Sequence, residues 1–298
     1  MVIGGRFNLN LTELCEPSAQ TNNVYIVAEA GINHNGDFSI AKQLCIEAKK
    51  IGCDSIKFQK RTIDVVYSKS FLSEPRESPW GSTQRDQKSG LELSLNEFIQ
   101  ISEFCKEIDI DFSASAWDFE SLDFIESLAP KYHKVASAFI TNSHFLRKVA
   151  KYRRPTFVST GMCELTDVDK AVEIFKSENC PFVLMHSVST YPTSLESLNL
   201  NLIKFYQDRY KVVVGYSGHE SGVSTTLFAV AFGAKVIERH FTLDRGMYGS
   251  DQSASLELEG MQRLVVGLRK YPKILGNGIK TFTNEEKKVA SKLRYWEN

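Results

Sequence analysis

The chain has 298 residues and 42% of them are hydrophobic, so it can bury a large core as one domain or as two smaller ones. Its 36 basic residues balance 36 acidic ones, which gives no global attraction for nucleic acid or for an anionic membrane surface. An anionic ligand must therefore be bound by a local cluster of positive charge.

The ends of the chain and its cysteines favour a cytoplasmic protein. No run approaches the roughly 20 apolar residues that a membrane span needs, and residues 1–23 lack the basic-then-apolar layout of a signal peptide. The six cysteines form no C-x-x-C pair, so we expect reduced thiols rather than metal ligands or disulfides. Residues 1–23 are interpreted as an N-terminal extension.

Eight short β-rich runs alternate with helix-period segments across residues 24–272. The runs cover residues 24–30, 55–59, 109–115, 133–137, 155–160, 181–187, 211–217 and 234–240. This alternation predicts parallel strands joined by crossover helices. Eight strand-helix units at this length predict a single-domain α/β protein, a closed (β/α)8 or TIM barrel. An open doubly wound sheet is the alternative, because periodicity does not distinguish the two.

The intervening segments carry helix signals. Apolar residues recur at helical spacing across 40–51, and Gly52 then ends the predicted helix. Ser94 followed by Glu97 has the spacing of a capping box and predicts the start of another helix.

Two segments depart from this rhythm. Residues 61–94 are too long for an ordinary connection between a strand and a helix, and we interpret them as a functional lid over the barrel mouth. Residues 273–298 form a charged C-terminal tail that is predicted to end in a helix.

Polar residues stand where nearly every predicted strand ends. They are Glu29, Lys57, Gln59, Ser113, Ser115, Lys134, Ser137, Ser159, Thr160, His186, Ser189, Ser217, His219 and His240. Because barrel strands are buried on both faces, polar residues at their carboxyl ends call for an explanation, and we expect all of them to converge on one rim.

Lys57 and Lys134 indicate an anionic ligand at that rim. Burying an uncompensated ammonium group costs several kcal/mol, so two such lysines among hydroxyl groups favour a ligand with phosphate and carboxylate groups. His219 and His240 follow neighbouring strands and can reach one divalent ion with Glu29 nearby. Helix capping or a hydrogen-bonded core position is the alternative for the two histidines.

Collinear motifs across residues 24–260 resemble the sialic acid synthase family. They are IVAEAGINHNGD, SIKFQK, KVASAFITN, VSTGM, YPT, GYSGHE, ERHFTLDR and GSDQSASLE. The resemblance implies a metal-dependent transferase that forms a C–C bond between phosphoenolpyruvate and an N-acyl hexosamine such as N-acetylmannosamine. The products are a nonulosonic acid and phosphate. The alternatives are the same chemistry on another aldose, as in a 3-deoxy-ulosonate synthase, and a non-catalytic barrel that binds sugar or phosphoenolpyruvate.

The resemblance also implies roles for particular residues. His219 and His240 would bind the metal, with Mn²⁺ expected and Mg²⁺ or Co²⁺ as alternatives. Glu29, Lys57 and Lys134 would be catalytic, and Glu29 would contact metal-bound water. The implied substrate-binding residues are Gln59, Ser115, Ser137, Ser189, Tyr191, Ser217 and Asp251. Among these, Tyr191 would act through its backbone and Asp251 would hold sugar hydroxyls.

The sequence departs from the family pattern at several points. Phe139 stands where many members carry an acidic residue, Ser187 replaces a cysteine, and Ser189 replaces an asparagine. The chain stops at Asn298, where relatives continue into an antifreeze-like domain that supplies an arginine to the sugar. We therefore expect that segment 61–94 or a separate capping polypeptide supplies this cation, and that the acceptor is an aldose other than N-acetylmannosamine or that N-acetylmannosamine binds with poor affinity. We also expect a homo-oligomer. Tyr248 lies in a stretch that is lysine-rich in animal relatives, which disfavours a 6-phosphorylated acceptor.

Overall fold

Residues 10–16, 18 and 21–297 are described by a computed structural model of the chain. The predicted extension at residues 1–23 lies partly outside the described residues. Within it, α1 (Leu11–Leu14) has both of its leucines buried.

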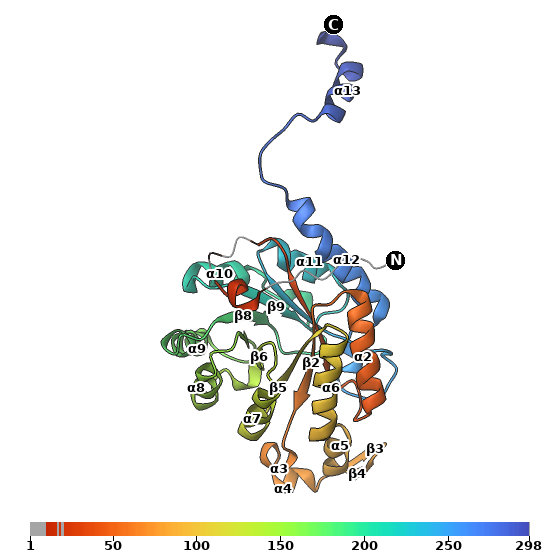
Figure 1. Ribbon diagram of the computed structural model, residues 1–298, viewed down its shortest axis with the longest axis vertical. Helices are drawn as coiled ribbons and strands as arrows, with labels where there is room; N and C mark the ends of the chain where they lie inside the picture. Colours follow the sequence, from red (N-terminus) through yellow and green to blue (C-terminus); the bar gives the residue numbers. More distant parts are fainter. Residues whose placement is uncertain (1–9, 17, 19–20, 298) are drawn as a thin grey trace.

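Eight parallel strands close into a barrel in the order β1-β10-β9-β8-β7-β6-β5-β2 (Figure 1). They are β1 (Tyr25–Gly31), β2 (Ser55–Lys60), β5 (Asp111–Ala116), β6 (His133–Val135), β7 (Thr156–Ser159), β8 (Phe182–Ser187), β9 (Val214–Gly218) and β10 (Val236–His240). The eight predicted strands and the (β/α)8 barrel are confirmed, and closure of the ring rules out the open sheet.

A helix follows each barrel strand and packs on the outside. These helices are α2 (Phe38–Ile51), α6 (Leu95–Glu107), α7 (Phe119–Ser127), α8 (Ser143–Lys151), α9 (Leu165–Ser177), α10 (Asn201–Tyr210), α11 (Ser224–Ala231) and α12 (Leu258–Leu275). Both helix-end signals predicted from the sequence are confirmed. Gly52 ends α2 with a left-handed φ of 94°, and Ser94 and Glu97 form the capping box of α6.

Strand alternation decides which side chains enter the barrel. In β1, Ile26 and Ala28 pack with the outer helices, whereas Tyr25 and Val27 belong to a separate apolar cluster inside the barrel. That inner cluster comes from the first halves of several strands and from α1. Because this cluster fills the amino-terminal end of the barrel, the cavity and polar groups such as Glu29 lie at the carboxyl end.

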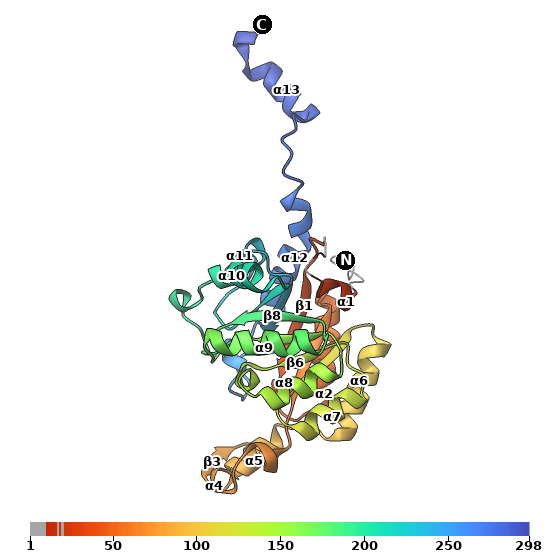
Figure 2. The same cartoon turned by 90° about the vertical axis from the view of Figure 1, so that its left-hand side faces the viewer.

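The segment predicted as a lid folds into short elements between β2 and α6. They are α3 (Ile63–Val66), α4 (Lys69–Leu72), the antiparallel pair β3 (Pro75–Ser78) and β4 (Gly81–Thr83), and α5 (Gln84–Gly90). We call residues 61–94 the insertion. It lies at the end of the molecule opposite the C-terminal tail (Figure 2). Arg61 and Glu92 join its two ends by an ion pair of 2.8 Å.

The tail leaves the barrel after α12, which continues to Leu275. It then forms α13 (Asn284–Leu293), which extends away from the barrel (Figure 1). None of the helices in the described part of the chain combines the length and apolar character of a membrane span. All six cysteines are free, as predicted.

Candidate active site

A cavity of about 710 Å³, including its opening to solvent, lies among the carboxyl ends of the barrel strands. Side chains from all eight strands or the loops after them line it. They are Glu29, Lys57, Gln59, Ser115, Trp117, Lys134, Ala136, Ser137, Ala138, Ser159, Met162, Ser187, Ser189, Tyr191, Ser217, His219, Glu238 and His240.

The structure thus brings together the residues for which the family resemblance implies a catalytic, metal-binding or substrate-binding role, with Asp251 at the edge. The Oδ2 atom of Asp251 lies 3.8 Å from Nδ1 of the cavity residue His240. The register of the sheet explains part of this arrangement, because Glu29 is aligned with Lys57 on β2 and with His240 on β10. The individual roles of these residues remain predictions.

The two buried lysines are already paired with carboxylates, so the prediction of uncompensated ammonium groups is wrong. Lys134 Nζ donates to both carboxylate oxygens of Glu238, at 2.8 and 2.9 Å. Lys57 Nζ forms an ion pair with Glu29 and lies 3.8 Å from Glu238 Oε1. Two ammonium groups and two carboxylates therefore share the floor of the cavity.

Glu238 is the residue that the sequence analysis missed. It stands two residues before His240 on β10, and both side chains line the cavity because strand residues at i and i+2 share a face. Arg239, between them, points outward and pairs with Glu220 at 3.0 Å. Two-residue periodicity around His240 was the signal that could have identified Glu238.

Burial and charge shift the pKa values of this quartet in different directions. Burial raises the pKa of Glu29, and the neighbouring Glu238 adds to the effect, although Lys57 opposes it. Burial alone would raise the pKa of Glu238, but Lys134 and Lys57 lower it to about 2. Burial lowers the pKa of Lys134, which Glu238 offsets only in part. For Lys57 the carboxylates of Glu238 and Glu29 outweigh burial and raise the pKa. The quartet is thus a buried, charge-balanced group in which Glu29 is the carboxylate most easily protonated.

Three serine hydroxyls surround Gly161 on one side of the cavity. A Cβ atom at position 161 would lie 2.3 Å from Ser189 Oγ and 2.7 Å from Ser137 Oγ. The third hydroxyl, Ser187 Oγ, lies 3.2 Å from Ser137 Oγ. Only glycine leaves this space open, and hydroxyl groups that converge on a small space can hydrogen-bond a compact anion. We call these three serines and Gly161 the serine cradle.

His219 and His240 lie side by side, with ring centroids 5.5 Å apart. His219 Nδ1 donates to the carbonyl oxygen of Val188 at 2.7 Å, so its Nε2 carries the free lone pair. Burial, and then the neighbouring His240, lower the pKa of His219 to about 3, which keeps its imidazole neutral at physiological pH. His240 Nδ1 is buried and has no hydrogen-bond partner among the described residues.

This donor set fits a metal ion that keeps open positions. No group of three or more His, Cys, Asp or Glu side chains in the described part of the chain is arranged to hold a metal. The two imidazoles would therefore supply the protein ligands, and substrate and water the remainder.

Tyr191 contributes its ring to the site. The ring lies over His219 with a centroid distance of 4.2 Å and meets His240 at 5.7 Å. We expected Tyr191 to contribute only its backbone, but its ring also contacts both imidazoles.

Three of the strand-end residues do not reach the cavity, which corrects the expectation that all of them converge. His186 faces outward, where its Nε2 lies 2.6 Å from the carbonyl oxygen of Leu198. Ser113 donates to the carbonyl oxygen of Tyr132 at 2.6 Å, and Thr160 donates to that of Met185 at 3.2 Å. Strand alternation turns His186 outward, and a nearby backbone carbonyl oxygen accepts the hydroxyl hydrogen bond of Ser113 and of Thr160.

Fold and site together define an enzyme of the TIM-barrel type with its polar cavity at the carboxyl end of the barrel. The sequence pattern of the NeuB family matches residues 44–280, and the chain belongs to this family. The predicted resemblance to sialic acid synthases is thereby confirmed.

Known relatives cover most of the chain. An N,N'-diacetyllegionaminic acid synthase of Legionella pneumophila is 36% identical over 287 residues, 94% of this chain and 81% of the relative. An N-acetylneuraminate-9-phosphate synthase of Drosophila melanogaster is 38% identical over 254 residues, 84% of this chain and 68% of the relative. A crystal structure of the N-acetylneuraminic acid synthetase of Leptospira borgpetersenii matches with a TM-score of 0.79 and 30% identity, covering 92% of this chain and 93% of that one.

The chain is accordingly an enzyme of the synthase class. Synthases of this family condense phosphoenolpyruvate with an N-acyl hexosamine to form nonulosonic acids. The family is generally metal-dependent.

Proposed function

We propose that this chain condenses phosphoenolpyruvate with an N-acyl hexosamine and releases a nonulosonic acid and inorganic phosphate. The observation that carries the proposal is that two ammonium groups, the serine cradle and two adjacent imidazoles line one cavity. The combination suits an anionic enol phosphate and a sugar aldehyde held next to each other.

Phosphoenolpyruvate would occupy the deep part of the cavity. Lys57 and Lys134 are 2% and 5% exposed, so a charged ligand that reaches them is largely removed from water. The serine cradle would hold the phosphate by hydroxyl donors, as Gly161 leaves room for it. Ser115, which accepts from Lys57 Nζ at 3.0 Å, and Ser217 would contact the same ligand. Each lysine would then share its hydrogen bonds between its carboxylate partner and the incoming anion.

The acceptor sugar would lie nearer the mouth. Tyr191 is 50% exposed and Gln59 is partly buried, unlike the deep lysines. Gln59 Nε2 donates to Glu29 Oε1 at 3.2 Å and would donate its second hydrogen to a sugar hydroxyl. Asp251, beside His240, offers a carboxylate to further hydroxyls.

His219 and His240 would hold the divalent ion, for which we propose Mn²⁺, with Mg²⁺ or Co²⁺ as alternatives. Two observations support this assignment: His219 is neutral with its Nε2 lone pair available, and the buried Nδ1 of His240 accepts or donates no hydrogen bond within the described part of the chain. When bound, such an ion polarises the sugar aldehyde as a Lewis acid.

The residues of the floor would serve the chemical steps. C3 of the enol phosphate forms the new bond to C1 of the aldehyde with the electron pair of its C2=C3 double bond, so positive charge develops at C2 and the aldehyde oxygen becomes an alkoxide. Glu29, with its raised pKa, accepts a proton from the water that adds at C2. The C2–O(phosphate) bond of the resulting hemiketal phosphate then breaks, and the C2 hydroxyl becomes a ketone as its proton leaves with the phosphate. The proton held by Glu29 passes to the alkoxide at C1. Lys57 and Lys134 stabilise the departing phosphate.

A cytoplasmic location, a homo-oligomer and a separate capping polypeptide remain predictions from the sequence. The same holds for the expectation that the acceptor differs from N-acetylmannosamine. These predictions concern the location, the assembly and the particular acceptor rather than the reaction.

A phosphate-release assay tests the proposal. Phosphoenolpyruvate and Mn²⁺ are incubated with a panel of N-acyl hexosamines and simple aldoses, and the products are identified by mass spectrometry. We expect phosphate only when an N-acyl hexosamine is present and none after EDTA. Phosphoenolpyruvate binding without phosphate release from any acceptor would identify a non-catalytic barrel instead, and a preference for simple aldoses would indicate a 3-deoxy-ulosonate synthase.

A further inference from the structure

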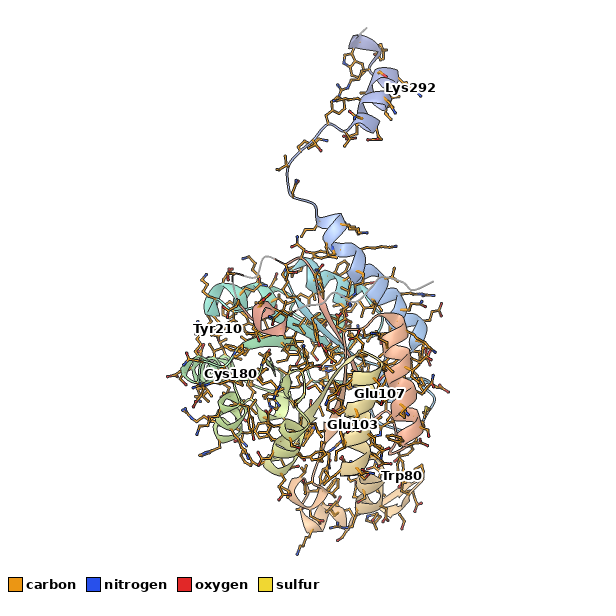
Figure 3. The ribbon with its side chains drawn as sticks, viewed as in Figure 1. Trp80, Glu103, Glu107, Cys180, Tyr210 and Lys292 are labelled. Atoms are coloured by element: carbon orange, nitrogen blue, oxygen red, sulfur yellow. The ribbon has the colours of Figure 1, made fainter. Side chains whose placement is uncertain are left out.

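The insertion meets the loop that follows β10, and Tyr248 is the point of contact. The rings of Trp80 and Tyr248 pack edge to face with centroids 5.4 Å apart and an interplanar angle of 79°. Gln87 Nε2 donates to the Tyr248 hydroxyl at 3.3 Å. Trp80 lies at the end of the molecule opposite Lys292 of the tail (Figure 3). Residues far apart in the sequence thus form one junction next to the barrel mouth.

The insertion side of this junction is closely packed. A Cβ atom on Gly90 would lie 2.1 Å from Trp80 Cγ, and a Cβ atom on Gly36 would lie 2.0 Å from the Gly90 carbonyl oxygen. The end of α5 is therefore pressed between the Trp80 ring and the loop after β1. At its start α5 is fixed by a capping box between Thr83 and Asp86. Little space remains for Trp80 to move away from Tyr248.

The other side of the loop is fixed by buried hydrogen bonds. Gln252, 1% exposed, donates from Nε2 to the carbonyl oxygen of Asn33 at 3.1 Å and accepts from Thr242. Ser255 Oγ donates to the Asp251 carbonyl oxygen at 2.6 Å. Asp251 therefore stands between two anchors, Tyr248 on one side and Gln252 on the other.

From this geometry we infer that Tyr248 is a positioning residue, which uses the insertion as a fixed support to hold Asp251 at the acceptor side of the cavity. The insertion then supports the loop after β10 from outside the cavity, through Trp80 and Gln87. The inference rests on the proposed function, in which Asp251 binds acceptor hydroxyls. It predicts that loss of the Tyr248 contacts raises the KM for the acceptor and leaves the KM for phosphoenolpyruvate unchanged. The proposed contacts of phosphoenolpyruvate lie on β2, β5, β6, β8 and β9 and in the serine cradle.

Steady-state kinetics of three variants test the inference. Tyr248→Ala removes both contacts and should raise the KM for the acceptor at least about tenfold, since small displacements of a positioning group are costly. Tyr248→Phe keeps the ring contact and loses one neutral hydrogen bond, so about a threefold rise is expected. Trp80→Leu should reproduce the tenfold effect from the insertion side. The KM for phosphoenolpyruvate should stay within about twofold of the wild type in all three.

Tyr152→Phe is the matched control, because its hydroxyl donates to Asp123 at 2.6 Å on the outer helices. It should change neither KM. Equal rises in both KM values, or a fall in melting temperature without a change in the acceptor KM, would overturn the inference and leave Tyr248 a purely structural residue. A wild-type enzyme that releases no phosphate with any acceptor would instead overturn the proposed function, and the inference with it.

Discussion

Replacing Glu238 by glutamine tests how the floor of the cavity is balanced. Glu238 accepts two hydrogen bonds from Lys134 and one from Ser217 at 3.1 Å, and its side chain is 7% exposed. Glu238→Gln keeps the shape and removes the charge, which leaves Glu29 as the ion-pair partner of Lys57 and takes away the carboxylate that pairs with Lys134.

The expected loss of stability is large. Removing one partner of a buried ion pair costs about 3–5 kcal/mol, because the remaining charge is left without compensation. With an unfolding entropy of roughly 2.1 cal/mol/K per residue, a chain of 298 residues would show a fall in melting temperature of about 5–8 °C. The phosphate and carboxylate of phosphoenolpyruvate would replace the missing charge, so saturating phosphoenolpyruvate should recover a substantial part of the difference from the wild type.

Thermal unfolding with and without phosphoenolpyruvate measures both effects. Glu220→Gln is the matched control, since Glu220 pairs with Arg239 at 3.0 Å in an equally buried place outside the cavity. It should lose stability that phosphoenolpyruvate does not recover. Phosphoenolpyruvate could instead recover the same share of the lost melting temperature in both variants, or recover none in either. Either result would show that Glu238 does not balance the charges that bind the ligand, and would refute the reasoning.

Three further predictions concern the metal, the phosphate and pH. His240→Ala should abolish Mn²⁺ binding, measured by calorimetry, and activity while circular dichroism stays unchanged; full turnover without bound metal would contradict the assignment. Lys134→Met should raise the KM for phosphoenolpyruvate by at least about tenfold and the KM for the acceptor far less, because Glu238 would then face the anion without the ammonium group of Lys134. Equal effects on both KM values would place Lys134 elsewhere in the mechanism. Because burial lowers the pKa of His219 from 6.5 to about 3, the unfolded chain binds a proton that the folded chain does not, and stability in EDTA should fall as pH drops below 6.5. In urea titrations between pH 7 and 5, His219→Asn should show a flatter dependence than the wild type, and an unchanged slope would show that His219 titrates normally.

Much of the site could be predicted because barrel strands place their carboxyl ends on one rim. Lys57 and His219 stand at predicted strand ends, and both line the cavity. His186 also stands at a strand end but faces α10, because a one-residue change of position reverses the direction of a side chain. Because the sequence locates a strand end only to within a residue or two, it does not determine whether such a side chain faces the cavity or the outer helices.

The sequence by itself determined the eight strand-helix units, the helix ends at Gly52 and Ser94, and the kinds of side chain available at the rim. These are local properties, set by periodicity and capping within a few residues. Only the tertiary structure decided that Lys134 meets Glu238, since β6 and β10 are 104 residues apart at this contact and are not neighbours in the barrel. Closure of the sheet brings the two strands together across the barrel interior. For that reason Lys57 and Lys134, which the sequence predicted to be uncompensated, already have carboxylate partners.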